Sequence, residues 1–121
     1  MDHFGRQLLH GYAQFGHREH LHMTWSYLGR GEPERVFPFL EHVARSHGGA
    51  DKLNATMTRF WVDLTAHAIA SSRAAAFDEL LERAPHLLDK GLPLRHWSRE
   101  RIFAPDARVG WVEPDLLALP F

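Results

Sequence analysis

Apolar residues recur at helical spacing along most of this chain, and that periodicity limits its fold more than any other feature. No stretch alternates apolar and polar residues for more than three or four positions, as a half-buried strand would. The sequence therefore predicts an all-α protein, a compact bundle of four to five helices. Glycine and proline stops place these helices at about residues 2–10, 16–29, 33–47, 55–71 and 73–84.

The last part of the chain has a different character from about residue 92 onward. Prolines become frequent there, and short helical turns are expected near 98–103 and 105–109, with Ser98 as an N-cap. Residues 111–121 should run as an extended, proline-rich tail across the bundle. Since 121 residues is the length of one domain, we expect a single helical domain over 1–121, with 92–121 packed against the rest.

Charge and cysteine content narrow the classes of partner. The net charge of −1 gives no overall attraction to nucleic acid or to an acidic membrane surface. The chain has no cysteine, its first residues lack the pattern of a signal peptide, and no apolar run approaches the ~20 residues that cross a bilayer. We therefore expect a cytoplasmic protein that binds neither nucleic acid nor membrane.

Two histidines mark the segment from Phe15 to Leu28 as the candidate site. At about 100° per residue, a helix there places His17 and His20 on the same side as Leu21, Thr24 and Leu28, the side that should be buried. A buried imidazole without a partner costs about 1–3 kcal/mol. Both rings should therefore contact a proton acceptor, a metal or a ligand.

The first hypothesis is a divalent metal site. Histidines three apart on a helix can bind one ion, and a third protein ligand would leave an open position for water or substrate. His67 is the first candidate for that third ligand, followed by His96 and His47, with Asp63 or Thr56 in support. Iron, zinc, manganese and nickel all accept such ligands.

The second hypothesis uses the same pocket without a metal. Aromatic walls from Trp25, Tyr27 and Trp61 around a few polar groups are typical of a small-molecule site, and a neutral ring there could accept a proton or bind a ligand. Arg101 is the candidate carboxylate clamp over this pocket. A third, purely structural interpretation has His17 bonded to a backbone carbonyl of the C-terminal segment and His20 paired with Asp63.

Three sets of residues carry a resemblance to a family. They are Phe15-Gly16-His17-Arg18-Glu19-His20-Leu21, Leu87-Leu88-Asp89-Lys90, and the later Ser98-Arg99-Glu100-Arg101 with Trp111-Val112-Glu113-Pro114-Asp115-Leu116. Together they resemble an uncharacterised family of small all-helical bacterial proteins. That family has Tyr-His-Glu-Thr before its long helix, where this chain reads Leu53-Asn54-Ala55-Thr56. The resemblance thus implies a pocket at this end of the bundle, and two of the family's polar residues are replaced here.

The sequence as a whole favours a small-molecule enzyme whose pocket centres on His17 and His20. A divalent metal would assist it, with oxygenase and hydrolase or lyase chemistry left open. The alternative is a non-catalytic protein that binds a small molecule, or an accessory protein, in which the inward histidines only form hydrogen bonds. Either protein could be a homodimer.

Overall fold

The computed structural model describes residues 1–121 and contains helices but no strand, which confirms the predicted all-α class. Five helices have seven or more residues, and three short ones of four or five residues follow in the C-terminal part. The longer helices are α1 (His3–Gly11), α2 (His17–Gly29), α3 (Val36–Ser46), α4 (Ala55–Ser72) and α5 (Phe77–Arg83). The short ones are α6 (Pro93–His96), α7 (Arg99–Ile102) and α8 (Pro105–Val109). Single 3₁₀ turns occur at η1 (Pro33–Arg35), η2 (Ala50–Lys52) and η3 (Pro85–Leu88).

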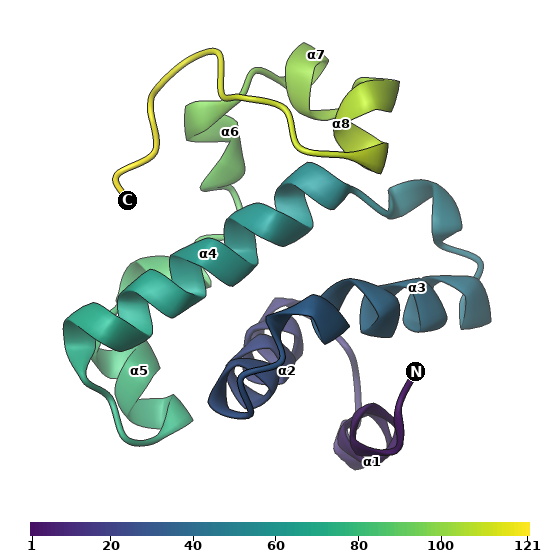
Figure 1. The fold of residues 1–121 in the computed structure, drawn as a ribbon, viewed down its shortest axis with the longest axis vertical. Coiled ribbons are helices and arrows are strands. Elements are labelled where there is room, and N and C mark those ends of the chain that lie inside the picture. Colours follow the sequence, from purple (N-terminus) through teal and green to yellow (C-terminus); the bar gives the residue numbers. More distant parts are fainter.

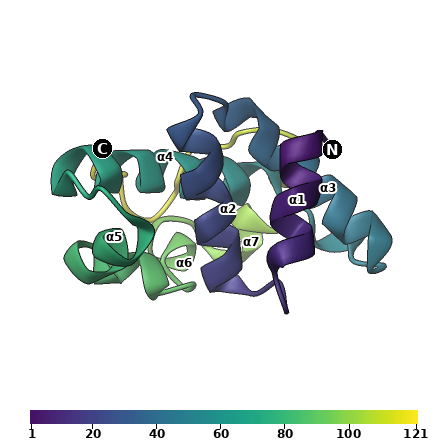
Figure 2. The ribbon, with the colours of Figure 1, turned by 90° about the horizontal axis from the view of Figure 1, so that it is seen from below.

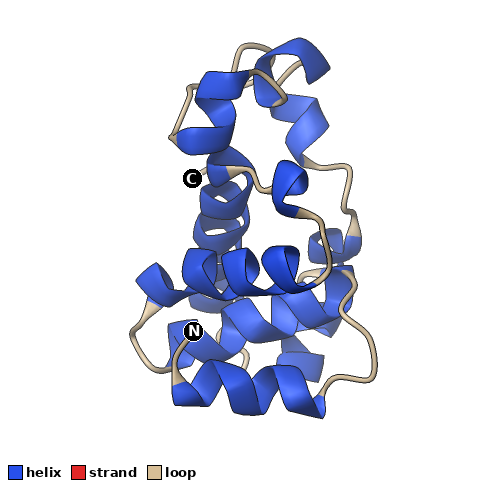
Figure 3. Cartoon of the chain, turned by 90° about the vertical axis from the view of Figure 1, so that its right-hand side faces the viewer, coloured by secondary structure: helices blue, strands red, loops and turns tan.

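Helix α4 lies at the centre of the fold. Figure 1 shows α1, α2 and α3 on one side of α4, and α6, α7, α8 and the tail on the other. Figure 2, seen from below, shows α2 crossing close to α4 with α1 and α3 beyond it. Figure 3 shows the same stacking, with helices joined by loops and no strand. Every longer helix except α1 packs against α4, and so does α8.

Two apolar clusters hold these helices together. The larger one joins α4 to the C-terminal part through Phe60, Leu64, Trp97 and Ile102 and also takes in Leu21 of α2. The smaller one consists of Met23, Tyr27, Val36 and Phe39 and is covered by α1. Helix α2 is therefore buried on two sides, whereas the sequence predicted one.

Local signals place the start of α4 and of α3. Asn54 caps α4 by accepting a hydrogen bond from the Met57 N–H at 3.0 Å, as predicted. Pro38 falls in the first turn of α3, where its missing N–H costs nothing, and the preceding residues form the 3₁₀ turn η1.

The boundaries differ from the prediction in two places. The helix predicted at residues 73–84 begins at Phe77, because Arg73 ends α4 in a left-handed conformation with φ of 55°. Helix α6 is not among the predicted helices. Pro93 is its first residue, a position that proline tolerates.

The C-terminal tail is bonded to the short helices beneath it. The Trp97 indole donates to the Val112 carbonyl at 3.0 Å, and Asp115 accepts from both the N–H and the hydroxyl of Ser98. These contacts fix the tail in the extended form expected from sequence. No helix combines the length and the apolar character that a membrane crossing requires.

Candidate functional site

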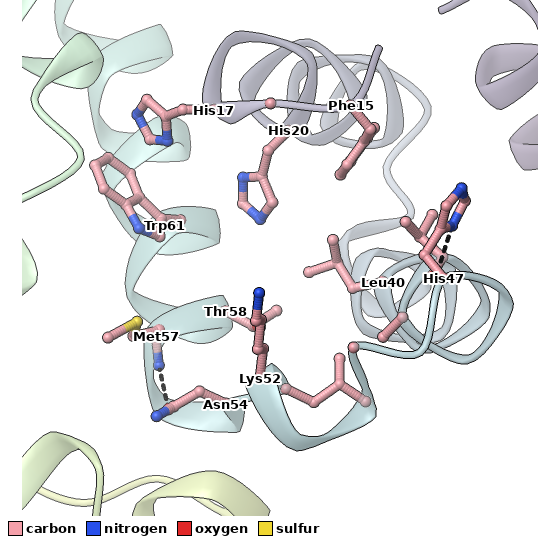
Figure 4. Close-up of a pocket in the computed structure, with 15 residues that line it drawn as sticks. Phe15, His17, His20, Leu40, His47, Lys52, Asn54, Met57, Thr58 and Trp61 are labelled. Carbon is pink, nitrogen blue, oxygen red and sulfur yellow. Dashed lines mark hydrogen bonds between the residues drawn. The ribbon is translucent and has the colours of Figure 1, made fainter.

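A pocket of about 540 Å³ opens between the start of α2, the end of α3, the turn η2 and the start of α4 (Figure 4). Its walls are mostly apolar, and its polar groups come from histidine, lysine, asparagine and threonine. The lining residues are Phe15, Gly16, His17, His20, Leu40, Val43, Ala44, His47, Gly49, Lys52, Leu53, Asn54, Met57, Thr58 and Trp61. The volume is within the usual range for small-molecule sites.

His20 is the polar group most directly presented to this pocket. Figure 4 shows its ring pointing from α2 toward the middle of the cavity. Protein surrounds the ring except on that side, and its Nδ1 atom is buried without any hydrogen-bond partner. Nε2, the other ring nitrogen, also has no partner in the protein but is not buried. The ring is therefore free to bind something that enters the pocket.

Burial keeps His20 uncharged at neutral pH. Removal from water, reinforced by the neighbouring His17, lowers the pKa of His20 to about 4. A buried N–H without an acceptor is rarer in proteins than a buried acceptor without a donor. We therefore assign the proton to Nε2, which makes neutral His20 a hydrogen-bond donor toward the pocket.

His17 is fixed by the scaffold. Its Nε2 donates to the carbonyl oxygen of Leu87 at 2.7 Å, and its ring meets the Trp61 indole edge-on with centroids 4.7 Å apart. Because a carbonyl oxygen can only accept, Nε2 carries the proton and the lone pair of a neutral ring lies on Nδ1. The structural interpretation of His17 is thus confirmed in kind, although its carbonyl belongs to η3 and not to the tail.

The two rings are nearly parallel, with a 10° angle between their planes and 6.4 Å between their centroids. An ion bound to both would lie in the plane of each ring, along a nitrogen lone pair. In this arrangement one of the four nitrogens is occupied by Leu87 and another is the buried Nδ1 of His20. In this arrangement the two rings are placed to form hydrogen bonds, not to bind one ion together.

Lys52 is the pocket residue that sequence reasoning missed. It comes from η2, and Figure 4 shows its side chain extending toward His20 from the opposite wall. No signal pointed to it, because a lysine after Gly48 and Gly49 is typical of a solvated loop. The turn itself is held in place, since Arg108 of α8 donates to the backbone carbonyl of Asp51.

Asn54 has a structural role although it lines the pocket. Its side-chain oxygen caps α4, and its Nδ2 donates to the Ile102 carbonyl at 2.7 Å. Both ends of the amide are therefore used within the protein. The asparagine joins the start of α4 to α7.

His67 does not join His17 and His20. It lies six residues after Trp61 on α4, which is about 9 Å along the axis and on a different face of the helix. There it lines another pocket, stacks against Phe121 with centroids 5.6 Å apart and lies 3.5 Å from the Ser71 hydroxyl. The structure holds no group of three or more histidine and acidic side chains placed to bind a metal ion.

The other supporting residues also lie elsewhere. Trp25 borders a separate hollow with Leu28 and Ile69, because it is five residues beyond His20 on α2. Thr56 points to the opposite side of α4, where its hydroxyl contacts the carbonyls of Ala107 and Gly110. Arg101 donates to the Glu113 carbonyl at 3.2 Å and so holds the tail.

Asp63 contacts neither histidine with which it was associated. It pairs with Arg59, one turn earlier on α4, at 3.5 Å. The predicted pairing with His20 is therefore wrong, and the ring of His67 has only Ser71 within hydrogen-bond distance.

The two remaining histidine candidates bond to backbone carbonyls, one at the end of α3 and one in the C-terminal tail. His47 lies at the rim of the pocket and binds the Val43 carbonyl through Nδ1 at 2.9 Å, the capping role considered from sequence. His96 is buried, and its Nδ1 lies 3.0 Å from the Leu117 carbonyl in the tail. Neither ring approaches the α2 pair closely enough to form a three-histidine site.

Comparison with protein-family models, with curated proteins and with solved structures finds no match to this chain. The resemblance to the family of small bacterial proteins therefore stays a prediction.

Proposed function

We propose that the protein binds a small molecule in the pocket between α2, α3 and α4, with His20 donating a hydrogen bond to it. The observation that carries this proposal is the lack of any protein partner for His20 inside a well-packed helical structure. An unpaired buried polar group of this kind costs about 1–3 kcal/mol. That cost belongs to Nδ1, while Nε2 faces the open pocket and is left to donate a hydrogen bond to a ligand.

The apolar walls of the pocket indicate that part of the ligand is apolar. Phe15, Leu40, Met57 and Trp61 present apolar and aromatic surface around His20. Burial of apolar surface supplies most of the binding energy in such sites, while one or two polar groups set the orientation. The proposed ligand therefore has an apolar body and at least one hydrogen-bond acceptor.

A titration with octanamide tests this proposal. The probe is uncharged, carries an acceptor on an apolar chain and should bind with a Kd on the order of 1 mM, as expected for a ligand of its size. NMR signals of the His20 ring and the Trp61 indole should shift together. In a His20→Phe variant the affinity should fall at least about fivefold, which corresponds to one hydrogen bond.

A His42→Phe variant is the matched control, because His42 lies on the far side of α3, outside this pocket. Its affinity for octanamide should equal that of the unaltered protein. Octanamide shifts that avoid His20 and Trp61, or that survive unchanged in His20→Phe, would contradict the proposal.

A metal-assisted enzyme is the second candidate, favoured by two imidazoles one turn apart on the same pocket wall. To bind an ion through Nε2, His20 must move its proton to the buried Nδ1, and no acceptor waits there. Metal analysis of untagged protein at neutral pH, beside a His17→Ala/His20→Ala double variant, tests this candidate. Stoichiometric iron, zinc, manganese or nickel that disappears in the double variant would support it.

A further inference from the structure

The ionisable side chains that line the pocket are all basic. Of its lining residues, Lys52 is the one with a permanent charge, and three histidines accompany it. No aspartate, glutamate or arginine lines the cavity. The nearest acidic residue in sequence, Asp51, takes part in no ion pair, and neither does Lys52. The cation at this wall therefore has no counter-charge in the protein.

Two helix N-termini add to this positive potential. Helices α2 and α4 are 13 and 18 residues long, and the first turn of each lines the pocket. The N-terminus of a helix carries about half a positive elementary charge and favours anions. Glu19 offsets part of this effect at α2, where its carboxylate accepts from the Gly16 N–H at 2.8 Å.

Helix α3 is the one helix whose C-terminus, its negative pole, lies at the pocket. The carbonyl groups near this end already accept hydrogen bonds within the protein. Near the end of α3, the carbonyl of Val43 accepts from both the backbone and the ring of His47, and that of Ala44 accepts from the Gly49 N–H at 2.7 Å. These carbonyls are occupied and present little negative charge to the cavity. The balance of charges in the pocket is therefore positive.

We propose that the ligand of this pocket is a carboxylate with an apolar chain, held between Lys52 and His20. This inference rests on the proposed small-molecule site and adds the chemical class of its ligand. Figure 4 shows the two side chains reaching toward the same space from opposite walls. One oxygen of the carboxylate accepts from His20 Nε2, the other faces the Lys52 ammonium, and the chain lies along Phe15, Leu40 and Trp61.

A carboxylate fits this site better than a phosphate does. Phosphate groups are bound most often by arginine forks or by several backbone N–H groups together. No arginine lines the cavity, and at α4 Asn54 already occupies the Met57 N–H. One lysine and one neutral donor suit a single negative charge.

Octanoate, octanamide and octyl phosphate test the inference, because they share a chain and differ in the polar group. Calorimetric or NMR titrations at neutral pH and low salt should show octanoate binding about tenfold tighter than octanamide, as expected for a charge-assisted contact. In Lys52→Gln that preference should disappear, and in Lys52→Arg it should persist. Lys90→Gln is the matched control, since Lys90 is exposed and lies outside the pocket, and it should keep the full preference.

The outcomes separate this inference from the proposed function. Equal binding of octanoate and octanamide, or a preference that survives in Lys52→Gln, would overturn the carboxylate assignment and leave the small-molecule site intact. Octyl phosphate binding tighter than octanoate would also overturn it. If none of the three probes perturbs His20 and Trp61, both proposals fail.

Discussion

His17 donates a hydrogen bond to the carbonyl oxygen of Leu87, 70 residues later in the chain, at 2.7 Å. This bond joins the first turn of α2 to the 3₁₀ turn η3 that follows α5. The neighbouring His20 has no such bond, although it lies on the same side of the same helix. The two histidines therefore differ in role: the first belongs to the scaffold and the second is left for a ligand.

Replacement of His17 should destabilise the protein. In His17→Phe a ring of similar size remains against Trp61, but the Leu87 carbonyl loses its donor. We expect the free energy of unfolding to fall by about 1–2 kcal/mol, the cost of leaving a part-buried acceptor unpaired. Urea denaturation followed by circular dichroism measures this change. An unchanged midpoint would show that the bond contributes nothing to stability.

Replacement of His20 should instead stabilise the protein. Phenylalanine keeps the aromatic volume and removes the unpaired Nδ1 atom, so the desolvation cost disappears. We expect His20→Phe to raise the free energy of unfolding by about 0.5–2 kcal/mol while it weakens ligand binding, as is common when a functional residue is replaced. The same urea experiment serves as the measurement. A loss of stability similar to that of His17→Phe would mean that His20 is a structural residue.

The pKa of His20 also predicts how stability depends on pH. That pKa is lowered to about 4 in the folded protein from 6.5 as the ordinary value, so between these values the unfolded chain binds the extra proton. Stability is therefore fully present above pH ~6.5 and falls as the pH decreases toward 4, by on the order of 2 kcal/mol between pH 7 and 5. Urea denaturation at pH 7 and pH 5 measures the loss.

The His20→Phe variant isolates this contribution from those of other groups. His22 titrates in the same direction, because burial, aided by Arg18, lowers its pKa as well. The part of the pH dependence that belongs to His20 is the difference between the unaltered protein and His20→Phe. A variant with the same pH dependence as the unaltered protein would contradict the assignment of a lowered pKa to His20.

The helices could be predicted from sequence where a local signal sets their ends. Asn54 caps α4 through its own side chain, and Ser98 does the same for α7, so neither depends on distant contacts. The inward direction of His17 and His20 also follows from helical period alone. The wrong predictions concern residues whose neighbours are set by tertiary packing. A helical period predicts a face of α4, but it does not predict that His67 stacks against Phe121.

The opposite wall of the pocket could not be predicted for a similar reason. Lys52 reaches the cavity because η2 folds back after α3, and Arg108 from α8 holds that turn by the Asp51 carbonyl. A contact between residues so far apart in the chain leaves no periodic signal. The sequence therefore predicted the histidine wall of the pocket correctly. It assigned the third polar group to His67 of α4, whereas the structure places Lys52 of η2 opposite the histidines.

Gly5 packs directly beneath the hydroxyl of Tyr27, which donates to Asp2 at 2.5 Å and so fastens α1 to the smaller apolar cluster. A Cβ atom on Gly5 would collide with that hydroxyl and come within 2.8 Å of both the Asp2 carboxylate and Met1. Although alanine favours a helix by up to ~1 kcal/mol over glycine, we expect Gly5→Ala to lower the free energy of unfolding by about 1–3 kcal/mol, because Tyr27 must move. Gly11→Ala is the control in the same helix, where a Cβ atom meets nothing within 4 Å, and it should leave stability unchanged or raised. Equal effects of the two substitutions in urea denaturation would contradict a tight contact between α1 and Tyr27.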